Sequence, residues 1–235
     1  MAAKLGDVVV VAPDKPQSAQ GHAVTMHKPL RLKKVDAGLG VETWECSGTP
    51  ADTVKLAKDV ILKDKKVDLV LSGINHGSNA SINIIYSGTM SAATEGALEG
   101  YKSIGFSLEN FSHDADFTAA KIYAEKIIKI ALSSNDYDKF LLNVNIPNLP
   151  VESIKGIKIC RQAKGKWVEE FVSAVDPMGI PYYWMTGKFE NEEPEAEDTD
   201  LWALKNGFVS IVPSTFDLTD YKLIDKIHFF ENEQF

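Results

Sequence analysis

Cysteine is scarce in this chain of 235 residues, and its two thiols, Cys46 and Cys160, stand far apart. Two distant cysteines exclude both a disulfide framework and a cysteine-based zinc site. No apolar run approaches the roughly 20 residues that a membrane-spanning helix needs, and the first residues lack the layout of a secretory signal. The sequence therefore predicts a reduced, cytoplasmic protein that does not act in a membrane.

Basic residues are also in deficit, because 25 lysines and arginines stand against 33 acids and give a formal net charge of −8. A protein that binds a nucleic-acid polymer needs a basic face, so this balance disfavours that class. Small phosphorylated substrates stay compatible with it, since a metal ion can supply local positive charge. Seven of the acids lie between Glu190 and Asp200 without a base among them, which is typical of a solvated loop.

Strand and helix patterns alternate along the first 150 residues. The run Val8–Val11 is β-branched throughout and suits a strand buried on both faces of a parallel sheet. The expected strands cover 8–11, 67–72, 104–108 and 140–144, and the expected helices cover 50–62, 89–98 and 116–132. This alternation predicts an α/β fold, a Rossmann-like, doubly wound and mostly parallel sheet.

The first six residues read as the end of a helix that stops at Gly6. A helix that leads into a parallel strand such as Val8–Val11 is the second half of a βαβ unit. We therefore expect the first strand of that unit to lie outside this chain.

The pattern changes after residue 150. We expect residues 1–150 to form the α/β core and residues 151–235 to complete the same domain as a C-terminal hairpin and oligomerisation region. The turn-rich stretch 176–181 leads to three consecutive aromatics, Tyr182, Tyr183 and Trp184. Exposed aromatics on a projecting hairpin favour subunit contacts.

In open α/β sheets, ligands bind beyond the carboxyl ends of the strands. One segment of interest there is Ser87-Gly88-Thr89, which opens an expected helix. Small residues at a helix start leave backbone N–H groups free for an anion, and two hydroxyls add donors, so a phosphate fits. The alternative is that Ser87 or Thr89 simply caps the helix.

Two further candidates follow strand ends. Asn75, in Ser72-Gly73-Ile74-Asn75, could bind a hard cation such as Mg²⁺ or Mn²⁺ through its amide oxygen, or it could form an Asx turn. His22 lies in a polar loop after the first strand and is the histidine best placed for proton transfer. Asp52 is expected to serve the first turn of its helix.

Taken in order, these segments closely resemble the SurE survival-protein family. In the first half the motifs are Ala12-Pro13-Asp14, Gln17-Ser18, Gly21-His22-Ala23, Gly48-Thr49-Pro50-Ala51-Asp52, Ser72-Gly73-Ile74-Asn75 and Tyr86-Ser87-Gly88-Thr89. In the second half they are Asn143-Val144-Asn145-Ile146-Pro147, Arg161-Gln162, Asp176-Pro177, Pro181-Tyr182-Tyr183-Trp184 and Gly207-Phe208-Val209-Ser210-Ile211. The resemblance extends over essentially the whole chain.

The resemblance implies a metal-dependent phosphatase that hydrolyses nucleoside 5′- and 3′-monophosphates and assembles as a homodimer or homotetramer. It implies Ser18 and Asn75 as ligands of a divalent metal ion, Mg²⁺ or Mn²⁺. Ser87, Gly88 and Thr89 would hold the phosphoryl oxygens, and His22 is the candidate for proton transfer. The family's pair of aspartates, which follows its first strand and also binds the metal, has no counterpart in this sequence.

That departure leaves two hypotheses open. The first is a nucleotidase of the SurE type. The second is a truncated, non-catalytic homologue that assembles or binds nucleotide without metal, because two neutral ligands hold a divalent cation weakly. A dinucleotide-binding protein is disfavoured, since no Gly-x-Gly-x-x-Gly motif follows a strand.

Overall fold

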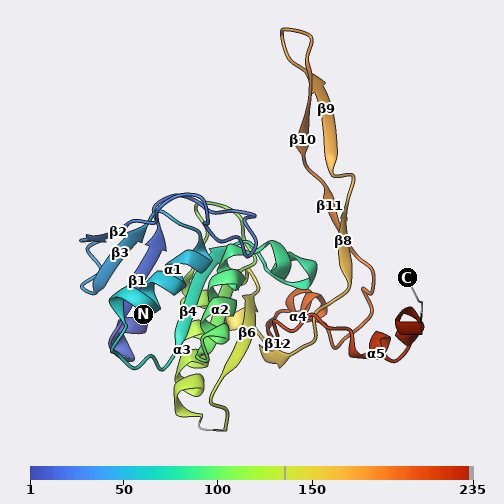
Figure 1. Cartoon of the computed structure of the whole chain (residues 1–235). Helices are drawn as coiled ribbons and strands as arrows, with labels where there is room; N and C mark the ends of the chain where they lie inside the picture. Colours follow the sequence, from blue (N-terminus) through green and yellow to red (C-terminus); the bar gives the residue numbers. More distant parts are fainter. Residues whose placement is uncertain (135, 233–235) are drawn as a thin grey trace.

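The computed structural model describes residues 1–134 and 136–232. Its central sheet has five strands in the order β4-β5-β6-β12-β7 (Figure 1). These strands are β4 (Val70–His76), β5 (Lys102–Leu108), β6 (Phe140–Ile146), β7 (Gly156–Ile159) and β12 (Phe208–Ser214). All neighbours run parallel except β12, which is antiparallel to β6. The predicted α/β fold with a mostly parallel sheet is confirmed.

Helices cover both faces of this sheet. The apolar stripe of α3 (Thr118–Ser133) packs with Ile104 and Phe106 of β5 in the largest core cluster. On the other face α2 (Gly88–Leu98) places Met90 against β5, where the added Cβ of any larger residue at Gly105 would lie 2.4 Å from the Met90 sulfur. Because β5 is covered on both sides, nearly all of its residues are buried, as expected for a parallel sheet between two helical layers.

A second, three-stranded sheet lies beside the first, in the order β1-β3-β2. Its strands are β1 (Val9–Pro13), β2 (Leu32–Val35) and β3 (Glu42–Cys46). The expectation that Val8–Val11 is buried on both faces is wrong, since these residues are only half-buried. The physical reason is that β1 pairs with β3 on one edge, while the other side of β1 borders a cavity that separates it from β4.

The other local predictions are mostly confirmed within a few residues. Helix α1 (Pro50–Leu56) begins with Thr49 as N-cap and Pro50 in the first turn, and a π-helical turn, η2 (Ala57–Ile61), continues it. At the start of the chain the helix is a single 3₁₀ turn, η1 (Ala2–Lys4). A 3₁₀ segment, η3 (Ser81–Tyr86), precedes α2. A shorter 3₁₀ turn, η4 (Val151–Ser153), precedes β7.

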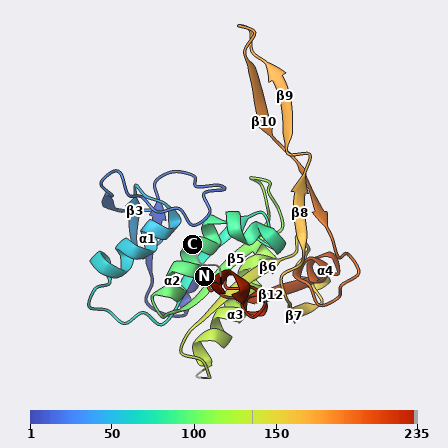
Figure 2. The same cartoon turned by 45° about the vertical axis from the view of Figure 1, so that its right-hand side comes forward.

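A long antiparallel arm rises from the body (Figures 1 and 2). Its lower part pairs β8 (Gly165–Val168) with β11 (Lys188–Asn191), and its outer part pairs β9 (Phe171–Val175) with β10 (Pro181–Met185). Every residue of β10 is exposed. The projecting hairpin with exposed aromatics is therefore confirmed.

Most acids of the run below the arm are exposed, as expected for a solvated loop, but the run also makes specific contacts and its last residue is buried. Arg161 binds the carboxylates of Glu193 and Asp198, and Asp200, the first residue of α4 (Asp200–Lys205), is fully buried. The Asp200 carboxylate accepts hydrogen bonds from the backbone N–H groups of Ser81, Ala163 and Leu201. These bonds explain the burial, because they satisfy a charge that would otherwise be costly to remove from water.

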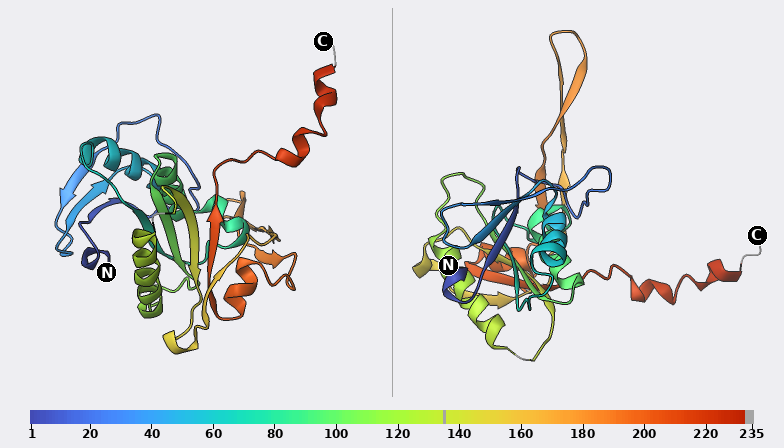
Figure 3. Two further views of the ribbon diagram at one scale, coloured as in Figure 1. Left: turned by 90° about the horizontal axis from the view of Figure 1, so that it is seen from below. Right: turned by 60° about the vertical axis from the view of Figure 1, so that its left-hand side comes forward.

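The C-terminal segment leads away from the body (Figure 3). It contains a short helix, α5 (Tyr221–Ile224), and a 3₁₀ turn, η5 (His228–Asn232). Among the described residues, none of the helices combines the length and the apolar character needed to cross a bilayer. Strands β7 and β12 join the same sheet as β4, β5 and β6, while the division at residue 150 stays a prediction.

Candidate functional site

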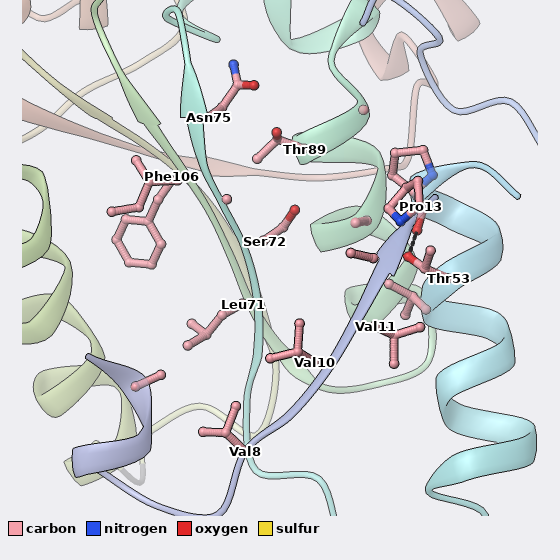
Figure 4. A pocket seen from close by; sticks show the side chains of 18 of the residues that line it. Val8, Val10, Val11, Pro13, Thr53, Leu71, Ser72, Asn75, Thr89 and Phe106 are labelled. Carbon is pink, nitrogen blue, oxygen red and sulfur yellow. Dashed lines mark hydrogen bonds between the residues drawn. The ribbon is translucent and has the colours of Figure 1, made fainter. Parts of the chain in front are cut away.

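A cavity of about 1800 Å³ lies between β1 and β4. Figure 4 shows Val8, Val10 and Leu71 at its apolar end, where the two strands come together. At the opposite end, where the strands diverge, Asn75 and Thr89 lie along the β4 side. Both strands reach this end with their carboxyl termini, which is where ligands bind in α/β sheets.

A bulge in β4 sets the position of Asn75. The register between β4 and β5 shifts between Ser72 and Asn75, and Gly73 has a φ of 112°. A Cβ at Gly73 would lie 2.3 Å from the Phe106 carbonyl oxygen, so only glycine allows this approach. The Asn75 amide nitrogen donates to the Gly77 carbonyl oxygen at 2.9 Å. This local bond matches the turn alternative, yet it leaves the Asn75 oxygen available to a ligand.

The amino end of α2 carries the segment expected to hold phosphate. The Ser87 side chain is 8% exposed and its hydroxyl accepts from the Met90 backbone N–H at 3.0 Å, so Ser87 is the N-cap. The next N–H groups, those of Gly88 and Thr89, have no intrahelical acceptor. The capping alternative is therefore correct for Ser87, and it does not compete with phosphate binding at the two free donors.

The loop that carries Ser18 packs against this helix start. A Cβ at Gly88 would lie 3.0 Å from Cγ of Pro50 and 3.3 Å from the carbonyl oxygen of Gln17. Glycine at this position thus lets the backbone next to Ser18 approach α2. Ser18 itself is exposed and lines the same cavity as Asn75, Gly88 and Thr89.

Hydrogen bonds fix this loop, residues 17–25, to both neighbouring helices. Gly21 donates its N–H to the Tyr86 carbonyl at 3.1 Å, and its own carbonyl accepts from the Ser91 hydroxyl at 2.5 Å. On the α1 side, the Asp52 carboxylate accepts from the backbone N–H groups of Thr25 and Thr49. The predicted role of Asp52 in the first turn of α1 is confirmed as a capping box.

His22 also helps to hold residues 17–25 against the neighbouring helices. Its Nε2 lies 2.7 Å from Oε2 of Glu95, and Nζ of Lys55 lies 2.5 Å from Oε1 of the same carboxylate. The Glu95 side chain is 3% exposed. Burial alone would raise the pKa of Glu95, but the hydrogen bonds from Lys55 and His22 outweigh it and the pKa is lowered. His22 is not among the cavity-lining residues, which favours a positioning role for it.

The donor set around the cavity does not complete a site for a hard divalent cation. Ser18 and Asn75 offer neutral oxygens, whereas Mg²⁺ and Mn²⁺ bind through carboxylates as well. The acids that line the cavity, Asp7, Glu42 and Asp68, precede or begin their strands and lie at the amino end. Within residues 1–134 and 136–232, no cluster of three histidine, cysteine or acidic side chains could hold a metal ion.

Two cavity-lining residues were not anticipated from the sequence. Trp167 of β8 donates its indole N–H to Oδ1 of Asn83 at 2.9 Å, across 84 positions of the chain. Both residues line the cavity. Neither has a sequence signal of its own, because the pairing depends on how the arm folds back beside η3.

The comparisons with known proteins agree on one family. The sequence profile of "Survival protein SurE" matches residues 1–169. The protein named 5′-nucleotidase SurE from Cytophaga hutchinsonii is 52% identical over 225 residues, which are 96% of this chain and 86% of that protein. Its namesake from Flavobacterium johnsoniae is 53% identical over 225 residues, with coverage of 95% and 86%.

The comparison with solved structures points to the same family. The crystal structure of the SurE protein from Aquifex aeolicus superposes with a TM-score of 0.82 at 44% identity, covering 97% of this chain and 90% of that one. Identity at this level, over nearly the whole length and on the same fold, leaves one conclusion: the chain belongs to the SurE family.

Proposed function

We propose that this chain is a nucleotidase that hydrolyses nucleoside 5′-monophosphates, and 3′-monophosphates as well, to the nucleoside and phosphate. The name shared by its relatives, 5′-nucleotidase SurE, supports the first activity. The observation that carries the proposal is the close approach of the loop holding Ser18 to the amino end of α2 at Gly88. It brings hydroxyl and backbone donors together at the carboxyl edge of the sheet, where an anion is favoured.

In the reaction, the oxygen of a water molecule bonds to phosphorus and the bond between phosphorus and the ribose oxygen breaks. The electron pair of that bond stays on the ribose oxygen, which takes up a proton, while the attacking water gives up one of its protons. The N–H groups of Gly88 and Thr89, with the Thr89 hydroxyl, would donate to the phosphoryl oxygens as negative charge develops there. Because Ser87 caps the helix, these donors are held in place before substrate arrives.

His22 stays a prediction for the proton transfer. Its bond to the buried Glu95 supports a role in holding residues 17–25 against α2. A residue that acts in this way would affect substrate binding more than the chemical step.

We also propose that hydrolysis depends on a divalent cation, Mg²⁺ or Mn²⁺, with Ser18 and Asn75 as two of its ligands. Their neutral oxygens do not by themselves satisfy such an ion, so no step of the reaction is assigned to it. A weakly held cation predicts that activity rises with metal concentration into the millimolar range.

The test is release of phosphate from AMP by the full chain, titrated with Mg²⁺ and with Mn²⁺. Asn75→Ala should raise the metal concentration for half-maximal activity about tenfold. Asn75→Asp should lower it, because a carboxylate binds a hard cation more strongly than an amide does.

Binding of AMP without hydrolysis at any metal concentration would instead support the non-catalytic homologue. If wild type and both variants share one metal titration curve, Asn75 is not a ligand. A reaction that proceeds fully in the presence of a chelator would contradict the metal dependence.

The arm supports a proposal on assembly. Tyr183 and Trp184 of β10 are each 65% exposed, and aromatic side chains displayed in this way are enriched in protein interfaces. We propose that they contact a second copy in a homodimer or homotetramer. A cytoplasmic location is proposed from the two free, buried cysteines.

A further inference from the structure

An aromatic side chain lines the same cavity as residues 87–89, the segment proposed to bind phosphate. Trp167 belongs to β8 at the base of the arm, which lies beside η3 (Figure 1). Its exposed fraction is 37%, and it lines the same cavity as Ser87, Gly88 and Thr89. Part of a large apolar ring is therefore open to whatever occupies the cavity.

The indole is fixed by contacts with arm residues that are not among those lining the cavity. The Phe189 ring of β11 meets it edge-on, with 5.7 Å between ring centroids and 75° between planes. A Cβ at Gly187 would lie 3.3 Å from Cε3 of Trp167. With its N–H bonded to Asn83, the ring is held before any ligand binds, which lowers the entropic cost of stacking on it.

Asn83 offers a hydrogen-bond donor beside this ring. An indole nitrogen only donates, so the atom of Asn83 that faces Trp167 is the oxygen, and the NH₂ group points elsewhere. In the described part of the chain that NH₂ group has no acceptor. Asn83 lies in η3 and Ser87, four residues later, directly follows its end, a separation of about 8 Å at the rise of a 3₁₀ helix. A ribose spans a comparable gap between a base and its phosphate.

We propose that Trp167 and Asn83 form a subsite for the nucleobase of the substrate. The base stacks on the exposed part of the indole, and the Asn83 amide donates to a ring nitrogen or a carbonyl oxygen of the base. Every base has a π-face and an acceptor, so this subsite distinguishes nucleotides from other phosphate esters rather than one base from another. The inference rests on the proposed nucleotidase function and names how that site recognises the nucleoside part.

The experiment compares KM for AMP with KM for ribose 5-phosphate, which has the sugar and the phosphate but no base. Trp167→Ala should raise KM for AMP about tenfold, the size of effect found when a base loses its aromatic partner, and should leave KM for ribose 5-phosphate unchanged. Trp167→Phe should recover most of the loss. Trp44→Ala, which removes a tryptophan from β3 outside the cavity lining, is the matched control and should change neither value.

Equal increases for both substrates in Trp167→Ala would overturn the proposal, because they would mean that Trp167 only supports the arm. A chain that hydrolyses neither substrate would contradict the proposed function but still test the subsite. In that case, quenching of tryptophan fluorescence by AMP and not by ribose 5-phosphate, lost in Trp167→Phe, supports it. Quenching that is the same in wild type and Trp167→Phe overturns it.

Discussion

Replacing the buried Glu95 by glutamine tests how the loop that carries Ser18 is held. The Glu95 carboxylate accepts from His22 with one oxygen and from Lys55 with the other. A glutamine side chain has the same shape, but it presents an oxygen to one of these donors and an NH₂ group to the other. The oxygen faces Lys55, which can only donate, and the NH₂ group faces Nε2 of His22, which accepts only when the imidazole is neutral. Both contacts therefore lose the carboxylate charge, and the bond to a protonated His22 is lost altogether.

The cost of Glu95→Gln follows from the burial of the three side chains. A hydrogen bond to a charged group contributes about 1.5–3 kcal/mol, and Lys55 and His22 keep 47% and 37% of their side chains exposed. Water can therefore solvate the partner that is left, which places the loss at the lower end, at about 2 kcal/mol. For a domain of this size, that corresponds to a fall in Tm of about 4–8 °C.

The pH dependence of this loss has a definite sign. Burial raises the pKa of Glu95, but the bonds from Lys55 and His22 bring it below the ordinary value of 4.5. A carboxylate whose pKa is lowered by folding contributes stability above its unfolded pKa and loses it as the pH falls through the folded one. The difference in Tm between wild type and Glu95→Gln should therefore be full at neutral pH and shrink below about pH 4.5.

Thermal unfolding by calorimetry or circular dichroism across this pH range is the assay. Glu125→Gln is the matched control, because Glu125 forms an exposed pair with Lys129 one turn away on α3, and such pairs contribute about 0.3–0.5 kcal/mol. The same Tm for wild type and Glu95→Gln at neutral pH would refute the reasoning. So would a difference that persists unchanged in acid.

Two more predictions concern the start of α2 and the arm. Ser87→Ala should destabilise the protein by about 1 kcal/mol through the lost N-cap and should raise KM for AMP. The control is Thr199→Ala, which removes the cap of α4 and should lower stability without changing KM. Equal KM values for wild type and both variants would exclude the start of α2 from substrate binding. Tyr183→Asp places a charge on an exposed aromatic position of β10. This variant should sediment with the mass of a monomer. An assembly of unchanged mass would show that the outer part of the arm is not the interface.

Much of the fold could be predicted from local patterns. The spacing of Tyr123, Ala124, Ile127 and Ile128 marks one face of a helix, and the structure buries all four in the core. The start of α1 follows from Thr49 and Pro50, whose preferences for N-cap and first-turn positions are local. In such segments, propensity, pattern and tertiary packing favour the same conformation, so the sequence suffices.

The smaller sheet could not be predicted in the same way. Its strands β2 and β3 are four and five residues long and contain lysine, glutamate and threonine, so neither has a continuous apolar run or a strict alternation. Strand β2 pairs with β3, and β3 in turn pairs with β1, which lies more than twenty residues before it. The half-burial of Val8–Val11 has a similar cause, since it reflects the cavity beside β1 and nothing within the strand itself.

The candidate site was predictable in its parts but not in its connections. Ser18, Asn75 and the segment 87–89 all line one cavity, as the rule for carboxyl ends of strands leads one to expect. The bond between His22 and Glu95 joins residues 73 positions apart, and that between Trp167 and Asn83 joins residues 84 apart. Contacts between residues so far apart in the sequence are set by the fold, and a single sequence carries no signal for them.

The distribution of charge around the cavity determines how a phosphate ester would enter. The acids in its lining, Asp7, Glu42 and Asp68, stand at the amino ends of the strands, where Lys65 and Lys66 also lie. At the carboxyl end, the described lining holds Lys15 and the start of α2 but no acid. The positive end of a helix dipole and the Lys15 side chain attract an anion there, whereas the amino end has three acids against two lysines and is apolar in its depth. This distribution of charge supports the proposals that the phosphate binds at the open, polar end and that the base is directed along η3 toward the arm.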